Sequence, residues 1–197
     1  MARMADTVTL ADASAARAAY LETLRDLVEH ESPTSDKRAV DALGDRLERL
    51  LEARGWTVRR HPRSEVGDVL QAARRGGDGP STLLLTHMDT VWPLGTLEKM
   101  PVRDDGERFW GPGTVDMKAG IAAAIHAVEL LDAKGVPLVG DVTLLVTSDE
   151  ETGSQHSREL IEELARAHDR VFVLEPARDD GALKVGRKGG GIYTLRV

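Results

Sequence analysis

The sequence predicts an α/β fold with a mostly parallel sheet and helices on both faces. Three short apolar runs have the length and composition of buried strands, at 82–86, 141–147 and 171–174. Two segments with helical spacing of apolar residues separate these runs, at 117–134 and 157–168. Alternating strands and helices of these lengths indicate right-handed crossovers and parallel pairing of the strands.

The segment before these units adds two helices and two strands. Apolar residues recur at helical spacing over 15–31, where Ser-Pro ends the pattern, and again over 36–54, where glycine follows. The runs 56–61 and 67–73 are rich in strand-forming residues and are joined by a polar connection. Together these elements are enough to enclose one core.

Two further segments complete the expected organisation. Residues 88–115 form a long stretch rich in proline, glycine and charge, and loops of this length inside a compact domain are usually functional. The tail predicts two more strands, at 182–186 and 192–197, on either side of a glycine-rich turn.

Composition narrows the class of protein. The chain has 197 residues, 41% of them hydrophobic and 30% charged, as in an ordinary globular domain. Its net charge of −7 argues against nucleic acid or an anionic membrane as a partner. It has no cysteine, so a metal site here must use nitrogen and oxygen ligands. No signal pattern or membrane-length apolar run occurs, and we expect a cytoplasmic location.

Polar residues that can bind metal follow each apolar run. His87 closes the run 82–86, and a neutral imidazole is a good zinc ligand. Asp89, two residues later, is placed to accept a hydrogen bond from the other ring nitrogen. The alternative is a loop histidine whose hydrogen bonds are satisfied locally.

Asp116 follows two glycines and precedes the most apolar helical segment. One interpretation is a simple N-cap, and another is a carboxylate at a tight turn that bridges two cations ~3.5–4 Å apart. A phosphate-binding loop is disfavoured, because Gly111-Pro112-Gly113 lacks the third glycine and no Gly-Lys-Ser/Thr sequence follows.

Three more acids end the next two strands. Glu150 and Glu151 are adjacent, which is typical of a solvated turn, but their side chains diverge, so one can bind metal while the other acts as a general base. Glu175 follows the run 171–174 directly and is the least specific of the three. Because the ends of parallel strands meet at one edge of a sheet, all these groups are expected to lie together.

Three segments carry a resemblance to a known family. They are LLTHMDTV at 84–91, WGPGTVDMKAG at 110–120 and TSDEETGS at 147–154. In this order and spacing they resemble the signatures of the zinc-dependent metallopeptidases that include glutamate carboxypeptidase, the acetylornithine and succinyl-diaminopimelate deacylases and aminoacylase. The stretch 153–161 and the Glu175-Pro176 pair are most similar to the glutamate carboxypeptidase branch.

The resemblance implies a site for two zinc ions. It implies that Asp116 bridges the ions through its carboxylate, and that its peptide bond to Met117 is cis. His87 and Glu175 would bind one ion and Glu151 the other. Cobalt or manganese also suits a set of imidazole and carboxylate ligands.

The resemblance also implies the catalytic roles and the reaction. Glu150 would be the general base and acid, and Asp89 would orient His87. The implied reaction is hydrolysis of the amide bond of a small peptidyl- or N-acyl-amino acid by a water activated between two metal ions. An alternative hypothesis is a metal-binding remnant of such an enzyme without catalytic activity.

Finally, the resemblance implies that this chain is the N-terminal part of a longer protein. Residues 1–186 would form an incomplete catalytic domain of the zinc aminopeptidase/carboxypeptidase type, and 187–197 the hinge and first strand of a lid and dimerisation domain. The final zinc ligand, a lid histidine and a substrate-binding arginine find no match here, and the sheet edge would be bare. Full-length members are expected to be homodimers. The other histidines, none in a matching context, are predicted on surfaces or helix faces: His30, His61, His126, His156 and His168.

Overall fold

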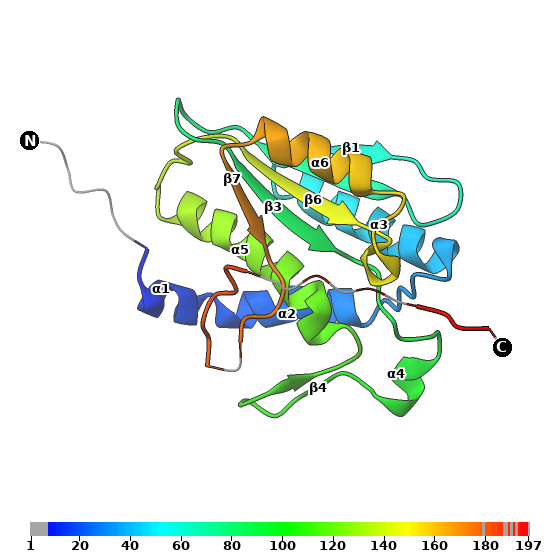
Figure 1. Cartoon of the computed structure of the whole chain (residues 1–197). Coiled ribbons are helices and arrows are strands. Elements are labelled where there is room, and N and C mark those ends of the chain that lie inside the picture. The colour runs from blue at the N-terminus through cyan, green and yellow to red at the C-terminus, as the bar shows by residue number, and fades with distance from the viewer. Residues whose placement is uncertain (1–7, 179, 187–188, 190, 192, 197) are drawn as a thin grey trace, which may run out of the picture.

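The computed structural model describes residues 8–178, 180–186, 189, 191 and 193–196. A five-stranded sheet forms its centre, with strands in the order β1-β2-β6-β3-β7 (Figure 1). The strands are β1 (Thr57–His61), β2 (Val69–Arg74), β3 (Thr82–His87), β6 (Val142–Thr147) and β7 (Arg170–Val173).

The sheet is mixed. β3 pairs in parallel with both β6 and β7, as the alternation of strands and helices predicts. β2 pairs antiparallel with β6 and with β1. The α/β class is therefore confirmed, with the parallel part of the sheet confined to the three strands that the site residues follow.

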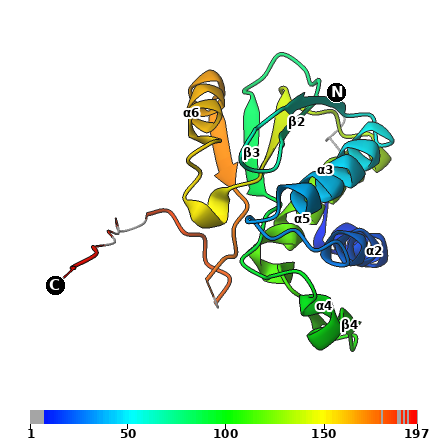
Figure 2. The same ribbon diagram turned by 90° about the vertical axis from the view of Figure 1, so that its right-hand side faces the viewer.

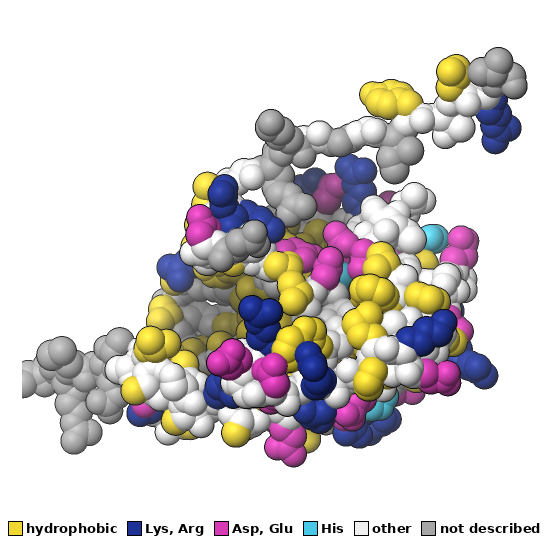
Figure 3. Space-filling view, turned by 90° about the horizontal axis from the view of Figure 1, so that it is seen from below, with side chains coloured by type: hydrophobic (Ala, Val, Ile, Leu, Met, Phe, Trp, Pro, Cys, Tyr) yellow, Lys and Arg dark blue, Asp and Glu magenta, His cyan; other side chains and the backbone are white. Residues whose placement is uncertain are grey.

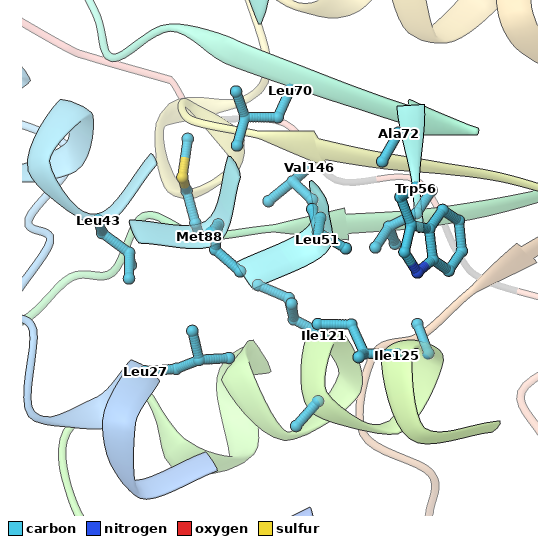
Figure 4. Packing of buried hydrophobic residues seen from close by; sticks show 14 of the residues in the cluster. Leu27, Leu43, Leu51, Trp56, Leu70, Ala72, Met88, Ile121, Ile125 and Val146 are labelled. Carbon is cyan, nitrogen blue, oxygen red and sulfur yellow. The ribbon is translucent and has the colours of Figure 1, made fainter. Parts of the chain in front are cut away.

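Helices cover both faces of the sheet (Figure 2). On one face lie α2 (Arg17–Val28), α3 (Lys37–Glu52) and α5 (Ala119–Ala133), and on the other lies α6 (Arg158–Ala167). The main core lies between the sheet and the first three helices (Figure 4), where Leu27, Leu43, Ile121 and Ile125 are fully buried. A smaller cluster joins α6 to the opposite face through Leu164.

Two predicted elements divide further in the structure. The helix expected over 15–31 is preceded by a short helix, α1 (Leu10–Ala15). Ala16 caps the end of α1 and the beginning of α2. The long loop at 88–115 contains a helical turn, α4 (Thr96–Lys99), and a small ribbon of β4 (Arg103–Asp104) and β5 (Phe109–Trp110).

The predicted tail strands are corrected. Residues 182–186 and 193–196 have no strand structure, and Ile192 and Val197 lie outside the described residues. A strand needs a neighbour for its backbone hydrogen bonds, and no described segment pairs with this tail. β7 is consequently an edge strand, with Phe172 and Val173 more than half exposed.

The described part of the chain contains no helix with the length and apolar character that a bilayer span requires.

Five histidines lie outside the strand-end motifs. Each contacts another group of the protein, and none of them joins a metal-capable group among the described residues: His30, His61, His126, His156 and His168.

Candidate metal centre

His87 is the central residue of the site. It is the last residue of β3, and its side chain is only 1% exposed. Its Nδ1 lies 3.0 Å from the backbone oxygen of Asp89 and 3.4 Å from a carboxylate oxygen of the same residue. A proton on Nδ1 satisfies the backbone oxygen, and Nε2 faces the acidic side chains, where a bound metal ion could take its lone pair.

Three carboxylates surround Nε2 of His87. The distances to this nitrogen are 3.0 Å from Asp116, 3.3 Å from Glu175 and 3.8 Å from Glu150. Glu151 completes the cluster. The ligand atoms of His87, Asp116 and Glu151 lie within 4.8 Å of one another, and so do those of His87, Glu150 and Glu175. The structure thus brings together all the residues that the sequence singled out at the strand ends.

The sheet explains why these residues meet. β3, β6 and β7 run in the same direction, so their carboxyl ends share one edge, and His87 pairs in register with Thr147 at the end of β6. After Val173 the chain stays beside β3, since the Leu174 N–H donates to Leu85, and this brings Glu175 to the same edge.

Asp116 reaches the cluster from the turn η1 (Thr114–Lys118), immediately before α5. Its peptide bond to Met117 is cis, as the resemblance implies. The sulfur of Met117 accepts a hydrogen bond from the backbone N–H of His87 at 3.2 Å, so this turn is attached directly to the end of β3.

Glu150 and Glu151 belong to the turn η2 (Glu150–Thr152) after β6. The residue before them, Asp149, is fully buried and organises the loop that follows, because its carboxylate accepts hydrogen bonds from the His156 N–H and the Ser157 hydroxyl. Glu150 is half exposed and faces the cluster, so the adjacent acids Asp149 and Glu150 have different environments.

The charges of the cluster favour a cation. Burial opposes a charged imidazole, but the surrounding carboxylates, Asp89 and Glu175 first among them, outweigh it and raise the pKa of His87 to about 11. Burial, reinforced by the neighbouring acids, raises the pKa of Glu150 and of Glu151. A bound divalent cation would relieve this repulsion and replace the proton on Nε2.

The ligand set fits two ions of the zinc type. It consists of one imidazole and several carboxylates, with no thiolate, which suits zinc, cobalt or manganese. His87 belongs to both groups of three, and carboxylates on either side of it can each serve a different ion. Figure 3 shows the molecule from below, with acidic side chains gathered near the middle of the face in view.

A pocket of about 460 Å³ opens beside the cluster, within the range of small-molecule sites. His87, Asp116, Glu150 and Glu175 form its polar wall. Leu85, Ile161 and Val173 are among the apolar residues of its lining, and Lys184 is the one lysine or arginine among its described lining residues.

Two residues near the site carried no signal in the strand-end pattern. Thr34, in the connection between α2 and α3, donates a hydrogen bond to the Asp89 carboxylate at 2.7 Å. Lys118 is buried, its Nζ donates to the backbone oxygen of His30 at 2.7 Å, and burial lowers the pKa of Lys118 to about 7. Sequence reasoning could have found Lys118, because a lysine at the start of an apolar helix is unusual. Thr34 offered no such signal, because it only follows the Ser-Pro pair that ends a helix.

Known proteins are similar to this chain in both sequence and fold. Carboxypeptidase G2 of Pseudomonas sp. (strain RS-16) is 38% identical over 200 residues, which cover 100% of this chain and 48% of that protein. A succinyl-diaminopimelate desuccinylase of Rhodospirillum centenum is 35% identical, over 87% of this chain and 47% of that protein. The chain spans about half the length of the curated relatives it matches.

The fold is shared with a solved structure of lower sequence identity. The M20 family metallo-carboxypeptidase Sso-CP2 from Sulfolobus solfataricus superimposes with a TM-score of 0.69 at 20% identity, over 80% of this chain and 37% of that protein. The profile of peptidase family M20/M25/M40 matches residues 83–188, more than half of the 197 residues and the segment that holds every strand-end motif. The chain therefore belongs to peptidase family M20/M25/M40.

Proposed function

We propose that this chain supplies most of a two-metal hydrolase site that cleaves the amide bond of a peptidyl- or N-acyl-amino acid. The observation that carries the proposal is the meeting of two metal-capable groups at His87, one of which includes the half-exposed carboxylate of Glu150. Residues 1–186 would form part of the catalytic domain, and residues 187–197 would lead into a further domain of a longer protein.

The distances support a division of roles among the carboxylates. Asp116 and Glu175 lie closer to Nε2 of His87 than Glu150 does, at 3.0 and 3.3 Å against 3.8 Å. We assign Asp116 and Glu175 to the ion held by His87. Asp116 also belongs to the group that contains Glu151, so it is the residue suited to bridge to a second ion.

Glu150 is then the general base and acid. Its side chain is half exposed at the wall of the pocket, where a water molecule and a substrate can reach it. It takes a proton from the attacking water and returns it to the nitrogen of the leaving amine. Its raised pKa brings the carboxyl closer to the working range of such a proton shuttle. Two zinc ions, when bound, supply Lewis-acid polarisation of the scissile carbonyl.

The other parts of the chain support this chemistry. Asp89 holds the imidazole of His87 from the Nδ1 side, and the pocket offers an apolar wall beside the polar one. The names of the two relatives, a carboxypeptidase and a desuccinylase, support an amide substrate that ends in an amino acid. A homodimer of the longer protein and a cytoplasmic location stay predictions.

A specific observation favours the alternative of a metal-binding chain without catalysis. His87 is the one histidine in both metal-capable groups of the described residues. Nε2 of His87 can bind only one ion, so the ion at Asp116 and Glu151 would have only carboxylates as ligands among the described residues. Two carboxylates are fewer than the three protein ligands that a catalytic zinc ion usually has, so the second ion would be held weakly.

The test is the zinc content of the purified chain, measured by elemental analysis, together with hydrolysis of an N-acyl-glutamate. We expect about two zinc ions per chain in the presence of excess zinc, fewer in Asp116→Ala, and turnover that requires zinc. Zinc binding without turnover would favour the alternative. No zinc binding, or binding unchanged in Asp116→Ala, would contradict the proposed site.

A further inference from the structure

The connection between α2 and α3 lies outside the three motifs and outside the family match, yet it is bound to the turn after β3. The Ser32 hydroxyl donates to the backbone oxygen of Met88 at 2.6 Å, and the backbone oxygen of Ser32 accepts from the Thr90 N–H at 2.9 Å. The Thr34 N–H donates to Thr90 at 3.1 Å. This backbone pairing holds Thr34 beside Asp89 whatever side chain residue 34 carries.

The Thr34 hydroxyl makes a separate contact with the Asp89 carboxylate. It donates to Oδ2 of Asp89 at 2.7 Å, and the Asp89 side chain is completely buried. The same carboxylate accepts from the backbone N–H of Glu150 at 3.3 Å and of Glu151 at 3.2 Å. One buried carboxylate therefore joins the helix connection to the turn that carries both glutamates.

The lengths of these bonds indicate which one determines the orientation of the carboxylate. The bond from Thr34 is the shortest, and the two backbone bonds lie at the long end of the range for N–H donors. Without the hydroxyl, Oδ2 would keep a single long hydrogen bond in a buried environment. The carboxylate would then rotate or admit water, because a buried charge needs its partners.

We propose that Thr34 is a positioning residue for Glu150 and Glu151, acting through the Asp89 carboxylate. The Thr34 hydroxyl holds that carboxylate in the orientation that binds both glutamate N–H groups, and the η2 turn then presents the two side chains to the cluster. The consequence for metal binding rests on the proposed function, whereas the consequence for the turn does not.

The variants separate the hydroxyl from the rest of the residue. Thr34→Val keeps the shape of the side chain and removes the donor, and Thr34→Ser keeps the donor. Thr143→Val is the matched control, since Thr143 is buried at the opposite end of β6 and its hydroxyl is paired with His168 at 2.8 Å.

The first measurement is hydrogen exchange of the Glu150 and Glu151 backbone amides by NMR in the metal-free chain. We expect exchange at these two amides to be roughly tenfold faster in Thr34→Val than in wild type. Thr34→Ser should restore the wild-type rates, and Thr143→Val should leave both amides unchanged. Unchanged exchange in Thr34→Val would overturn the proposal, as would a uniform acceleration over the whole chain that serine does not reverse.

The second measurement is metal affinity, using Co²⁺ and its visible absorption as the probe and Zn²⁺ in competition. We expect Thr34→Val to bind about 10- to 100-fold more weakly, the usual range for a lost outer contact, and Thr34→Ser to bind as wild type does. Equal affinity in Thr34→Val would overturn the link to the site. If wild type itself binds neither metal, the proposed function fails, and the amide exchange still decides the role of Thr34.

Discussion

Gly120, in the first turn of α5, lies directly against the backbone oxygen of Leu174. A Cβ atom at residue 120 would overlap that oxygen, which belongs to the residue immediately before Glu175. The close approach of α5 to the chain after β7 therefore depends on the absence of a side chain, and it sets the position of Glu175 relative to His87.

We predict that Gly120→Ala destabilises the chain and weakens zinc binding. The methyl group must push the Leu174 segment away, and overpacking of this kind costs about 1–3 kcal/mol. Glu175 would move with the segment, so its 3.3 Å approach to His87 would be lost. Urea denaturation and zinc titration measure the two effects.

Gly44→Ala is the matched control for this substitution. Gly44 lies in the middle of α3, and a Cβ there would meet the end of the Met88 side chain at 3.5 Å, an ordinary contact. Alanine in a helix is favoured over glycine by up to ~1 kcal/mol, so this variant should be at least as stable as wild type. Equal losses of stability in the two variants would contradict the importance of the Gly120 contact.

Removal of the charge should destabilise the chain at Asp149 but not at the neighbouring acid Glu150. Asp149→Asn should lower the free energy of unfolding by about 1–3 kcal/mol, because the buried carboxylate accepts two hydrogen bonds that shape the loop 149–157. Glu150→Gln, at a half-exposed position, should change it by less than ~0.5 kcal/mol.

Catalytic activity, in contrast to stability, should depend strongly on Glu150. In a hydrolytically active form of the protein, Glu150→Gln should reduce the rate by about 10²–10⁴-fold, since the amide cannot transfer the proton. The zinc content should remain at the wild-type level. Initial rates and elemental analysis on the same preparations test this, and a fully active Glu150→Gln would refute the role of Glu150 as the base.

Asp68 should make stability depend on pH in the acidic range. Partial burial opposes its ionisation, but hydrogen bonds from Lys37 and from the Arg63 N–H outweigh this and lower the pKa of Asp68 below its ordinary value of 3.8. The folded state therefore keeps the charge at a pH where the unfolded chain is already protonated. The stability from Asp68 is present above about pH 4 and is lost as the pH falls through the lower folded-state pKa.

The measurement is the difference in unfolding free energy between wild type and Asp68→Asn. We expect a loss of roughly 1 kcal/mol at pH 7 and a smaller gap below pH ~4. Asp78→Asn, at an exposed position, is the control and should leave the unfolding free energy at pH 7 within ~0.5 kcal/mol of wild type. A gap that grows as the solution becomes more acidic would mean that the shift has the opposite sign.

Zinc should stabilise the folded chain. A ligand that binds only the folded state adds about 2.7 kcal/mol when its free concentration is 100 times the dissociation constant. Thermal unfolding with added zinc and after chelation should therefore show a higher midpoint with the metal. His87→Ala should abolish the difference, because His87 belongs to both metal-capable groups. A zinc effect that survives this substitution would place the ion elsewhere.

Local pattern was sufficient for the central units of the fold. The apolar runs that became β3, β6 and β7, and the helical spacing that became α5 and α6, are signals within one element, and each strand carries its site residues at its own end. Parallel pairing then brings His87, Glu151 and Glu175 to one edge without further information. Their roles as metal ligands stay a proposal.

The tail and the first helix show where local pattern was insufficient. The alternating residues of 182–186 suit a strand, but a strand exists only where another segment accepts its hydrogen bonds. The backbone at Ala16, between α1 and α2, keeps a helical conformation, so the break needs no glycine or proline and the sequence gives no sign of it.

Residue type and spacing along the chain are enough to indicate the family, the α/β class and the polar residues at the strand ends. The position of β6 between β2 and β3, and the contact of Thr34 with Asp89 across 55 positions, became visible only in the folded chain. A hydrogen bond of that kind depends on how separate elements pack. Packing is a property of all the buried surfaces together, which no local run of residues encodes.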